Sequence, residues 1–339
     1  MRRGLSGACT PGCCQTGDDR VAAAKFRAVV TEAPASSANL GPGFDVFAMA
    51  LAEPTDVVEI EASETPSVKV QLKVKGGRRV PTAARANVAG AVALRMAEDF
   101  DLRARITMTL TKGVPIGRGL GSSAASSAAA AFAVNECFGL GLTKQRLVDY
   151  AAHGEFVACG TAHRDNVAAS LLGGFVMVPR QGSNEFVSFE APRSLTVCLA
   201  TPLVPTPKRK TEYARSLVPR TVTLEKVTDN ISSAATMAAG FASGDVAMIG
   251  RGMTDLIVEP ARAKTVPGYA MVKKAALLAG AVGACISGAG PTMLAMVDSE
   301  VTAPDVVLKA MVNAFKEAGV AAKGVATRPG KGARLKIGN

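Results

Sequence analysis

A glycine-rich segment followed by paired serines is the part of the chain best suited to chemistry. It runs from Lys112 to Val134 and reads KGVPIGRGLGSSAASSAAAAFAV. Its three alternating glycines are Gly117, Gly119 and Gly121. Glycines let backbone N–H groups approach an anion without interference from Cβ atoms, and the alanine-rich stretch predicts a helix whose N-terminus also attracts negative charge. We expect a phosphate-binding loop, in which one of Ser122 and Ser123 caps the helix and the other faces a metal ion.

Two common phosphate loops do not fit this segment. A Walker loop needs Gly-Lys followed by Ser or Thr, and this tripeptide is absent from the sequence. A dinucleotide-binding fingerprint needs G-x-G-x-x-G, whereas the segment has G-x-G-x-G. A tight turn before a buried helix of small residues is the simpler alternative, and the segment alone does not exclude it.

Two further glycine-containing turns carry polar residues. Ala33–Leu51 reads APASSANLGPGFDVFAMAL, in which a rigid turn after Asn39 delivers Asp45 at the start of the next predicted strand. Ile286–Thr292 reads ISGAGPT and precedes an apolar run typical of a buried strand. Taken singly, the first turn is equally typical of a Gly-Pro hairpin and the second of any tight turn.

Length and composition indicate a folded protein of two domains. The chain has 339 residues, enough for two hydrophobic cores, and is 48% hydrophobic. The absence of Trp and an aromatic content of 4% argue against base stacking, so nucleic acid is not an expected partner. The net charge of +11 is scattered along the chain, which is typical of a basic solvated surface and also suits phosphorylated small molecules.

The cysteine content and the apolar segments indicate in which cellular compartment the protein is expected. Seven cysteines and two histidines predict neither a disulfide framework nor a transition-metal site, so we expect reduced thiols in the cytoplasm. The uncharged run Ala275–Val297 contains turn residues and predicts a helix, a turn and a strand, so no membrane partner is expected. Residues 1–25 lack the apolar segment of a secretory signal, and Asp18 and Asp19 do not favour an organellar transit peptide. We expect a disordered extension there.

The apolar pattern predicts strands and helices that are segregated, which is typical of an α+β fold. The predicted strands are Phe26–Val30, Phe44–Leu51, Asp56–Glu61, Val68–Val74, Arg105–Thr111, Gly174–Val178, Leu195–Ala200 and Thr292–Val297. The predicted helices are Arg85–Phe100, Ser123–Phe138, Lys144–Cys159, Tyr269–Gly280 and Pro304–Ala318, with others between 208 and 250. The polar stretch Pro179–Arg193 predicts a domain boundary near residue 190.

Taken together, and in their order along the chain, the three glycine-containing segments resemble the motifs of the GHMP kinases. This superfamily is named for galactokinase, homoserine kinase, mevalonate kinase and phosphomevalonate kinase. The resemblance covers nearly everything from residue 26 onward. Within that superfamily the chain resembles the homoserine kinases. The matching segments are ANLGPGFD at Ala38–Asp45, GRGLGSSAAS at Gly117–Ser126, HRDNVAAS at His163–Ser170 and SGAGPT at Ser287–Thr292.

The resemblance implies a fold and an activity. The fold would be the α+β GHMP kinase fold, in which an ATP-binding domain at 26–190 contains a left-handed βαβ nucleotide site and 191–339 form a ferredoxin-like C-terminal domain. The activity would be ATP-dependent phosphorylation of L-homoserine to O-phospho-L-homoserine, a step toward threonine. The nucleotide would lie between the domains, and we expect a homodimer.

The resemblance also implies the residues that hold ATP and Mg²⁺. The loop expected to wrap the phosphates comprises Pro115, Ile116, Gly117, Arg118, Gly119, Leu120, Gly121, Ser122, Ser123, Ala124 and Ala125. Ser123 and Glu155 match the family's metal ligands, and a hydroxyl, a carboxylate and the triphosphate are a plausible ligand set for Mg²⁺. Without the resemblance, Glu155 is more typical of a surface charge on a helix.

The substrate residues are implied in the same way. An amino acid needs an anion for its ammonium group and a cation for its carboxylate. Asp45 is expected to bind the ammonium group beside Asn39, and two arginines are expected to bind the carboxylate through their planar guanidinium groups. The full expected set is Asn39, Asp45, His163, Asn166, Thr211, Arg215, Arg262 and Gly288.

The expected catalytic residues are Ser123, Glu155, Asp165 and Asn166, the last orienting the substrate hydroxyl. Asp165 resembles the catalytic aspartate of mevalonate and galactose kinases, but homoserine kinases are thought to need no dedicated base, so its role stays open. Ala289 replaces a serine that many relatives carry, which removes a hydroxyl and keeps the turn. The alternatives are a mevalonate-type kinase and a non-catalytic sensor of ATP and ligand.

Overall fold

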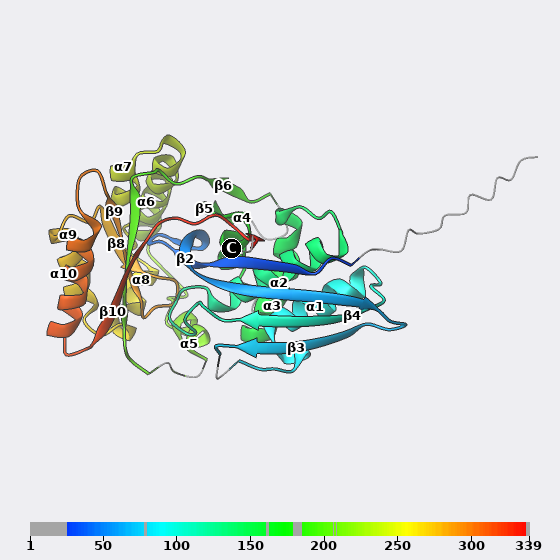
Figure 1. Ribbon diagram of the computed structural model, residues 1–339. Coiled ribbons are helices and arrows are strands. Elements are labelled where there is room, and N and C mark those ends of the chain that lie inside the picture. The colour runs from blue at the N-terminus through cyan, green and yellow to red at the C-terminus, as the bar shows by residue number, and fades with distance from the viewer. Residues whose placement is uncertain are drawn as a thin grey trace, which may run out of the picture.

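Two β-sheets, each covered by helices, make up the protein (Figure 1). The computed structural model describes residues 26–77, 80–160, 163–178, 185–205, 207 and 209–336, without the side chains of 158 and 159. The extension expected at residues 1–25 lies outside these described residues.

The first sheet contains strands from both ends of the described chain. Its members are β1 (Val29–Asn39), β2 (Gly43–Glu64), β3 (Lys69–Lys75), β4 (Ala104–Thr111), β5 (Phe175–Met177), β6 (Val187–Phe189) and β11 (Arg334–Leu335). The main path has the order β11-β1-β2-β4-β3, and β5 pairs with β2 and β6. β3 and β4 are parallel and are joined through a helix, as in a βαβ unit.

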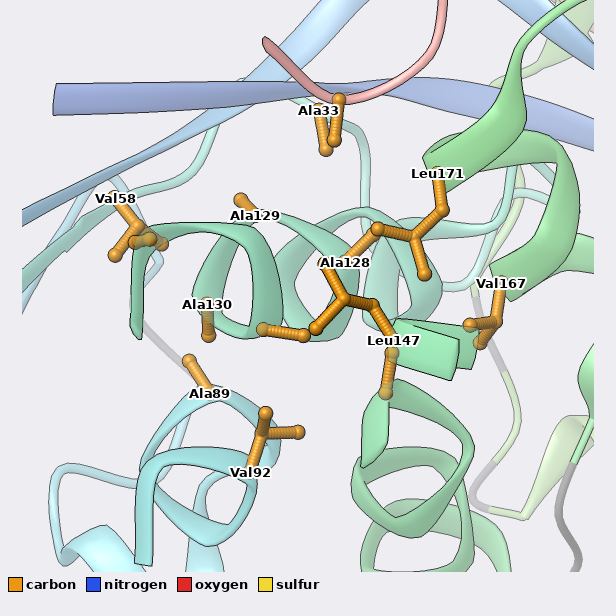
Figure 2. Packing of buried hydrophobic residues seen from close by; sticks show 14 of the residues in the cluster. Ala33, Val58, Ala89, Val92, Ala128, Ala129, Ala130, Leu147, Val167 and Leu171 are labelled. Carbon is orange, nitrogen blue, oxygen red and sulfur yellow. The ribbon is translucent and has the colours of Figure 1, made fainter. Parts of the chain in front are cut away.

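Four helices pack with this sheet, namely α1 (Val88–Asp99), α2 (Ser122–Phe138), α3 (Lys144–Cys159) and α4 (Arg164–Leu172). The alanine-rich α2 lies at the centre, with buried Ala128, Ala129 and Ala130 close to side chains of β1, α1 and α3 (Figure 2). Small side chains let the surrounding elements approach a helix on several sides, because little volume separates the backbones. The sheet and its helices thus share one core around the helix that follows the glycine loop.

The second sheet contains β7 (Leu195–Pro202), β8 (Gly283–Ile286), β9 (Met293–Asp298) and β10 (Ala322–Thr327). It is antiparallel with the order β10-β7-β9-β8. Numbered along the chain, this is the order 4-1-3-2 of a ferredoxin-like βαββαβ unit. Its helices are α5 (Lys210–Ser216), α6 (Leu224–Ser243), α7 (Val246–Arg251), α8 (Val258–Arg262), α9 (Tyr269–Leu278) and α10 (Pro304–Glu317).

The two sheets share a hydrophobic core. The ring of Phe175 from β5 stacks on that of Phe241 from α6, with 4.0 Å between centroids. The end of the described chain also joins the two units, because the chain leaves the second sheet after β10 and its last strand, β11, pairs with β1 in the first sheet. Ala333 there is fully buried in the core of the first sheet. The division near residue 190 stays a prediction.

The expected α+β fold with a ferredoxin-like second unit is confirmed, and several predicted elements agree closely with the observed ones. The helix predicted at Lys144–Cys159 is α3 with the same ends, and Pro304–Ala318 is α10 to within one residue. The run Ala275–Val297 contains the end of α9, β8, a turn and β9. No helix in the described ranges is long and apolar enough to cross a membrane.

Three predictions of secondary structure were wrong. The strands predicted at Phe44–Leu51 and Asp56–Glu61 are one strand, β2, because its pairing with β1 continues past Pro54 through a register shift. The strand predicted to end at Val30 continues to Asn39 as β1. Helix α4 was not predicted, since it is buried on nearly every side and lacks the polar face that reveals an amphipathic helix.

Candidate active site

A cleft of about 1050 Å³ is lined by residues of both units. Nearly every residue expected in the site lines this cleft, although these residues are separated by up to 249 positions in the sequence. They are Asn39, Asp45, Ile116, Gly117, Arg118, Gly119, Leu120, Gly121, Ser122, Ser123, Glu155, His163, Asp165, Asn166, Thr211, Arg215, Arg262 and Gly288. Of the expected phosphate loop, Pro115, Ala124 and Ala125 are not among the lining residues, and the two alanines are fully buried.

The glycine loop adopts backbone conformations that favour glycine. The φ angles of Gly117, Gly119 and Gly121 are 71°, 79° and 60°. Gly121 is the N-cap of α2, so no described side chain caps this helix, and the hydroxyl of Ser122 donates to the carbonyl of Val114 at 2.9 Å. The expectation that one of the two serines caps α2 is therefore wrong. The helix instead begins at the cleft with backbone N–H groups that a phosphate can accept from.

A buried aspartate holds the start of this loop. One carboxylate oxygen of Asp56 on β2 accepts from the backbone N–H groups of Gly113 and Val114, both at 2.9 Å. The other accepts from the ammonium group of Lys112 and, at 2.7 Å, from the hydroxyl of Ser126. Burial lowers the pKa of Lys112, and the carboxylate of Asp56 opposes this shift. This cluster joins the strand before the loop to the helix after it.

The third motif packs directly on the glycine loop. The hydroxyl of Ser287 donates to the carbonyl of Gly119 at 2.7 Å and lies 2.9 Å from the hydroxyl of Ser37 on β1. A Cβ atom on Gly119 would lie 2.3 Å from the Ser287 carbonyl oxygen and 2.6 Å from that of Gly290. The three motifs therefore meet at one point, where the backbones are too close for any side chain on Gly119.

Glu155 lies in the interior at the wall of the cleft. Its side chain is 3% exposed, and its Oε1 atom has no hydrogen-bond partner among the described residues. Burial raises the pKa of Glu155 to about 7, against the hydrogen bond from Ser123 and the charge of Lys112. A buried carboxylate oxygen without a partner suits a hard cation such as Mg²⁺. The described residues contain no cluster of three or more metal-binding side chains, so any cation here also needs ligands from phosphate or water.

Helix α4 brings three expected site residues to the cleft. His163 is its N-cap, and Asp165 and Asn166 follow in its first turn. Asp165 Oδ1 accepts from the backbone N–H of Asn166 at 2.7 Å and from its side-chain amide at 3.3 Å, while Asn166 Oδ1 accepts from Ser36 at 3.0 Å. Burial raises the pKa of Asp165 and lowers that of His163. The Asn166 amide is thus held in one orientation by two neighbours.

The charged groups expected to bind an amino acid lie together. Arg215 donates two hydrogen bonds of 2.9 Å to the carboxylate of Asp45, which forms a bidentate ion pair between α5 and the β1–β2 turn. Arg262 is 5% exposed and donates to the carbonyl of Gly288 at 3.2 Å. The ring of Phe44 lies between the two arginines, 5.3 Å from Arg215 Cζ and 5.0 Å from Arg262 Cζ. The anion and the cations that the resemblance implied are therefore adjacent, and Asp45 and Arg215 are paired with each other.

Sequence analysis missed several residues of the site, namely Ser36, Phe44, Asp56, Lys112 and Lys210. Ser36, Phe44 and Lys112 lie within or at the end of the glycine-containing segments, but no role was predicted for them. Lys210 is one of the scattered basic residues that were interpreted as solvated surface, although it is only partly exposed and lines the cleft. Asp56 could have been predicted as a buried carboxylate, because it is an acidic residue in a largely apolar strand.

The fold and the site define a class of enzymes with a glycine loop at the junction of an α+β unit and a ferredoxin-like unit. Known families match it. The GHMP kinases N terminal domain matches residues 87–174, and the GHMP kinases C terminal domain matches residues 237–323. The homoserine kinase of Natronomonas pharaonis is 43% identical over 91% of this chain and 99% of its own length. That of Thermoplasma volcanium is 41% identical over 81% of this chain and 86% of its own.

Solved structures agree. The crystal structure of homoserine kinase from Cytophaga hutchinsonii matches with a TM-score of 0.84 and 35% identity, over 91% of this chain and 97% of that one. The mevalonate kinase of L. major matches with a TM-score of 0.63 at 15% identity, over 89% of this chain and 96% of that one, and shows the fold alone. This chain belongs to the GHMP kinase superfamily and, within it, to the homoserine kinase family.

Proposed function

We propose that this protein transfers the terminal phosphate of ATP to the side-chain hydroxyl of L-homoserine, forming O-phospho-L-homoserine for threonine biosynthesis. The observation that carries this proposal is the set of opposite charges in the cleft that also holds the phosphate loop. Asp45, Arg215 and Arg262 supply one anion and two cations there. Mevalonate has a carboxylate but no ammonium group, so a mevalonate kinase has no use for Asp45 in this position.

The pair between Asp45 and Arg215 supports recognition of a zwitterion. An amino acid carries both an ammonium group and a carboxylate, so it offers each member of the pair a replacement partner. Both side chains are partly exposed, at 42% for Asp45 and 37% for Arg215, and exposed ion pairs cost little to separate. Homoserine can therefore enter by exchanging partners, with Arg262 as the second contact for its carboxylate.

The transfer itself depends on positioning. Phosphoryl transfer passes through a loose transition state that needs alignment and charge neutralisation more than strong deprotonation. The Asn166 amide, held by Asp165 and Ser36, is well placed to orient the acceptor hydroxyl. His163 and Thr211 line the same cleft and, with Asn39 and Gly288, would complete the expected substrate contacts. We assign Asp165 to holding Asn166.

Ser123 and Glu155 would hold Mg²⁺, for which the unpartnered Oε1 of Glu155 is the supporting observation. When bound, the ion neutralises charge on the phosphates. The loop from Pro115 to Ala125 would then surround the phosphates through its backbone N–H groups. The resemblance to homoserine kinases also supports a homodimer in the cytoplasm, which sedimentation of the purified protein and fractionation of cells would test.

The decisive test of the activity is ADP release by the purified protein with Mg-ATP and one acceptor at a time. We expect turnover with L-homoserine and none with R-mevalonate or D-galactose. Glu155→Ala gives the background rate of ADP release, since it should remove most of the turnover and leave the substrate-binding residues in place. Turnover with mevalonate would contradict the substrate assignment, and binding of ATP without turnover of any acceptor would favour a sensor.

A further inference from the structure

A lysine with no carboxylate partner among the described residues lies where the glycine loop meets the third motif. Lys210, at the start of α5, donates from its ammonium group to the carbonyl oxygens of Gly117, at 3.2 Å, and Gly290. The first carbonyl belongs to the phosphate loop and the second to the turn that packs on it. An ammonium group has three donors, so Lys210 retains one N–H beyond these two contacts.

Three of the other described cations of the cleft are paired with carboxylates, whereas Arg118 and Arg262, like Lys210, have backbone carbonyls as partners. Lys112 pairs with Asp56, Arg215 with Asp45, and the exposed Arg209 with Glu212 at 3.6 Å. Arg118 and Arg262 donate to backbone carbonyls, Arg118 to those of Pro202 and Val204 at 3.2 and 2.8 Å.

Lys210 has no carboxylate partner among the described residues, and two guanidinium groups lie near its charge. Burial, together with the charges of Arg118 and Arg262, lowers its pKa to about 7. The partners found among the described residues are carbonyl oxygens, not carboxylates. A buried lysine beside two arginines is favourable only when an anion lies among them, and a nucleotide phosphate is the anion that the loop is built to hold.

The neighbours of Lys210 point to one phosphate. Lys210 contacts the glycine loop, which is proposed to surround the phosphates, and it adjoins Thr211 and lies near Arg262, which are proposed to contact the acceptor. The phosphate between the rest of the nucleotide and the acceptor is the one transferred. We propose that Lys210 is a further catalytic residue, which donates a hydrogen bond to the terminal phosphate of the nucleoside triphosphate and neutralises charge on it during transfer. This inference rests on the proposed function.

The test compares Lys210→Met, Lys210→Gln and Lys210→Arg with Lys226→Met, which removes an exposed lysine on α6. We expect Lys210→Met to lower kcat about 100-fold and to change the KM for L-homoserine less than twofold, since preorganised charge at the reacting phosphate has effects of this size. Lys210→Gln should be nearly as slow because it keeps donors but no charge, whereas Lys210→Arg should recover most of the activity. Lys226→Met should match wild type.

Calorimetric titration separates a phosphate contact from a structural role. Lys210→Met should weaken binding of ATP about tenfold and leave binding of ADP within twofold, because only ATP carries the terminal phosphate. The melting temperature should not fall, since the substitution removes an uncompensated charge. Equal losses for ATP and ADP, a kcat within threefold of wild type, or Lys210→Arg as slow as Lys210→Met would each overturn the proposal. If wild type fails to turn over homoserine, the proposed function fails, and the ATP-against-ADP difference still decides the contact of Lys210.

Discussion

At the scale of single residues, Glu155 shows how a buried carboxylate costs stability. Its carboxylate is buried with one oxygen that no described group hydrogen-bonds, and burial raises its pKa from 4.5 to about 7. The folded state therefore holds the proton more tightly than the unfolded state does. As the pH rises from about 4.5 to 7, the unfolded chain loses this proton first, so the free energy of unfolding falls across that window.

We predict that Glu155→Gln stabilises the metal-free protein and inactivates it. The amide removes the buried charge, so the melting temperature should rise by about 2 °C or more at pH 8 and by less at pH 5. The kcat with L-homoserine should fall about 100-fold because the carboxylate ligand is lost. Glu317→Gln, on the exposed side of α10, should change neither quantity. A Glu155→Gln variant with lower stability and full activity would contradict the assignment of Glu155 as a metal ligand.

Arg262 gives a second prediction at this scale. Arg262→Leu should raise the KM for L-homoserine about 10-fold or more, because a charge-assisted hydrogen bond to the carboxylate is lost. The KM for ATP should stay within twofold. The matched control is Arg251→Leu at the exposed end of α7. An effect of Arg262→Leu confined to the KM for ATP would contradict the carboxylate role.

At the scale of elements, the site depends on one close approach between two turns. The glycine loop and the third motif touch through backbone atoms at Gly119, where carbonyls of Ser287 and Gly290 leave no room for a Cβ atom. Backbone carbonyls cannot rotate aside as a flexible side chain can. Glycine is therefore required there for space as well as for its φ of 79°.

Gly119→Ala should separate these two turns and raise the KM for ATP about tenfold or more, with a lower kcat. Gly141→Ala is the matched control, because Gly141 also has a positive φ, 66°, but nothing lies within 4 Å of its Cβ position. It should cost about 1 kcal/mol of stability and leave the kinetic constants unchanged. Equal kinetic losses in the two variants would show that backbone strain, and not the contact between the turns, determines activity.

At the scale of the whole molecule, the chain returns to its first sheet after completing its second. The backbone of Gly330 bonds to that of Ala50, β11 pairs with β1, and Ala333 enters the core beneath the sheet. This return ties the two sheets together in addition to their shared core. It also supports β1 and β2, which carry Ser36 and the turn with Asp45.

Ala333→Asp should destabilise the protein by about 3 kcal/mol or more, because it puts a carboxylate into an apolar core. Ala326→Asp makes the same change at an exposed position on β10 and should have little effect. Thermal unfolding and the yield of folded protein measure the difference. Similar melting temperatures for the two variants would show that the returning segment contributes little to the first sheet.

The features that depend on neighbouring residues were determined by the sequence itself. Alternating glycines before an alanine run predicted the turn that ends at the N-terminus of α2, and the periodicity of Lys144–Cys159 predicted α3 with its correct ends. Ordered motifs identified the family and hence the α+β fold. These signals are local, because backbone conformation and helix periodicity are set by residues a few positions apart.

Contacts between distant segments were decided only by the tertiary structure. Asp45 and Arg215 are 170 positions apart, and no pattern in the sequence shows that they bind each other. The anchoring of Lys112 by Asp56, the charge of Lys210 among carbonyls and the close approach at Gly119 follow equally from packing of separate elements. The physical reason is that the burial and the partners of a side chain depend on the whole packed chain. For this reason Lys210, which the sequence pattern assigned to the solvated surface, is a partly buried cation in the cleft.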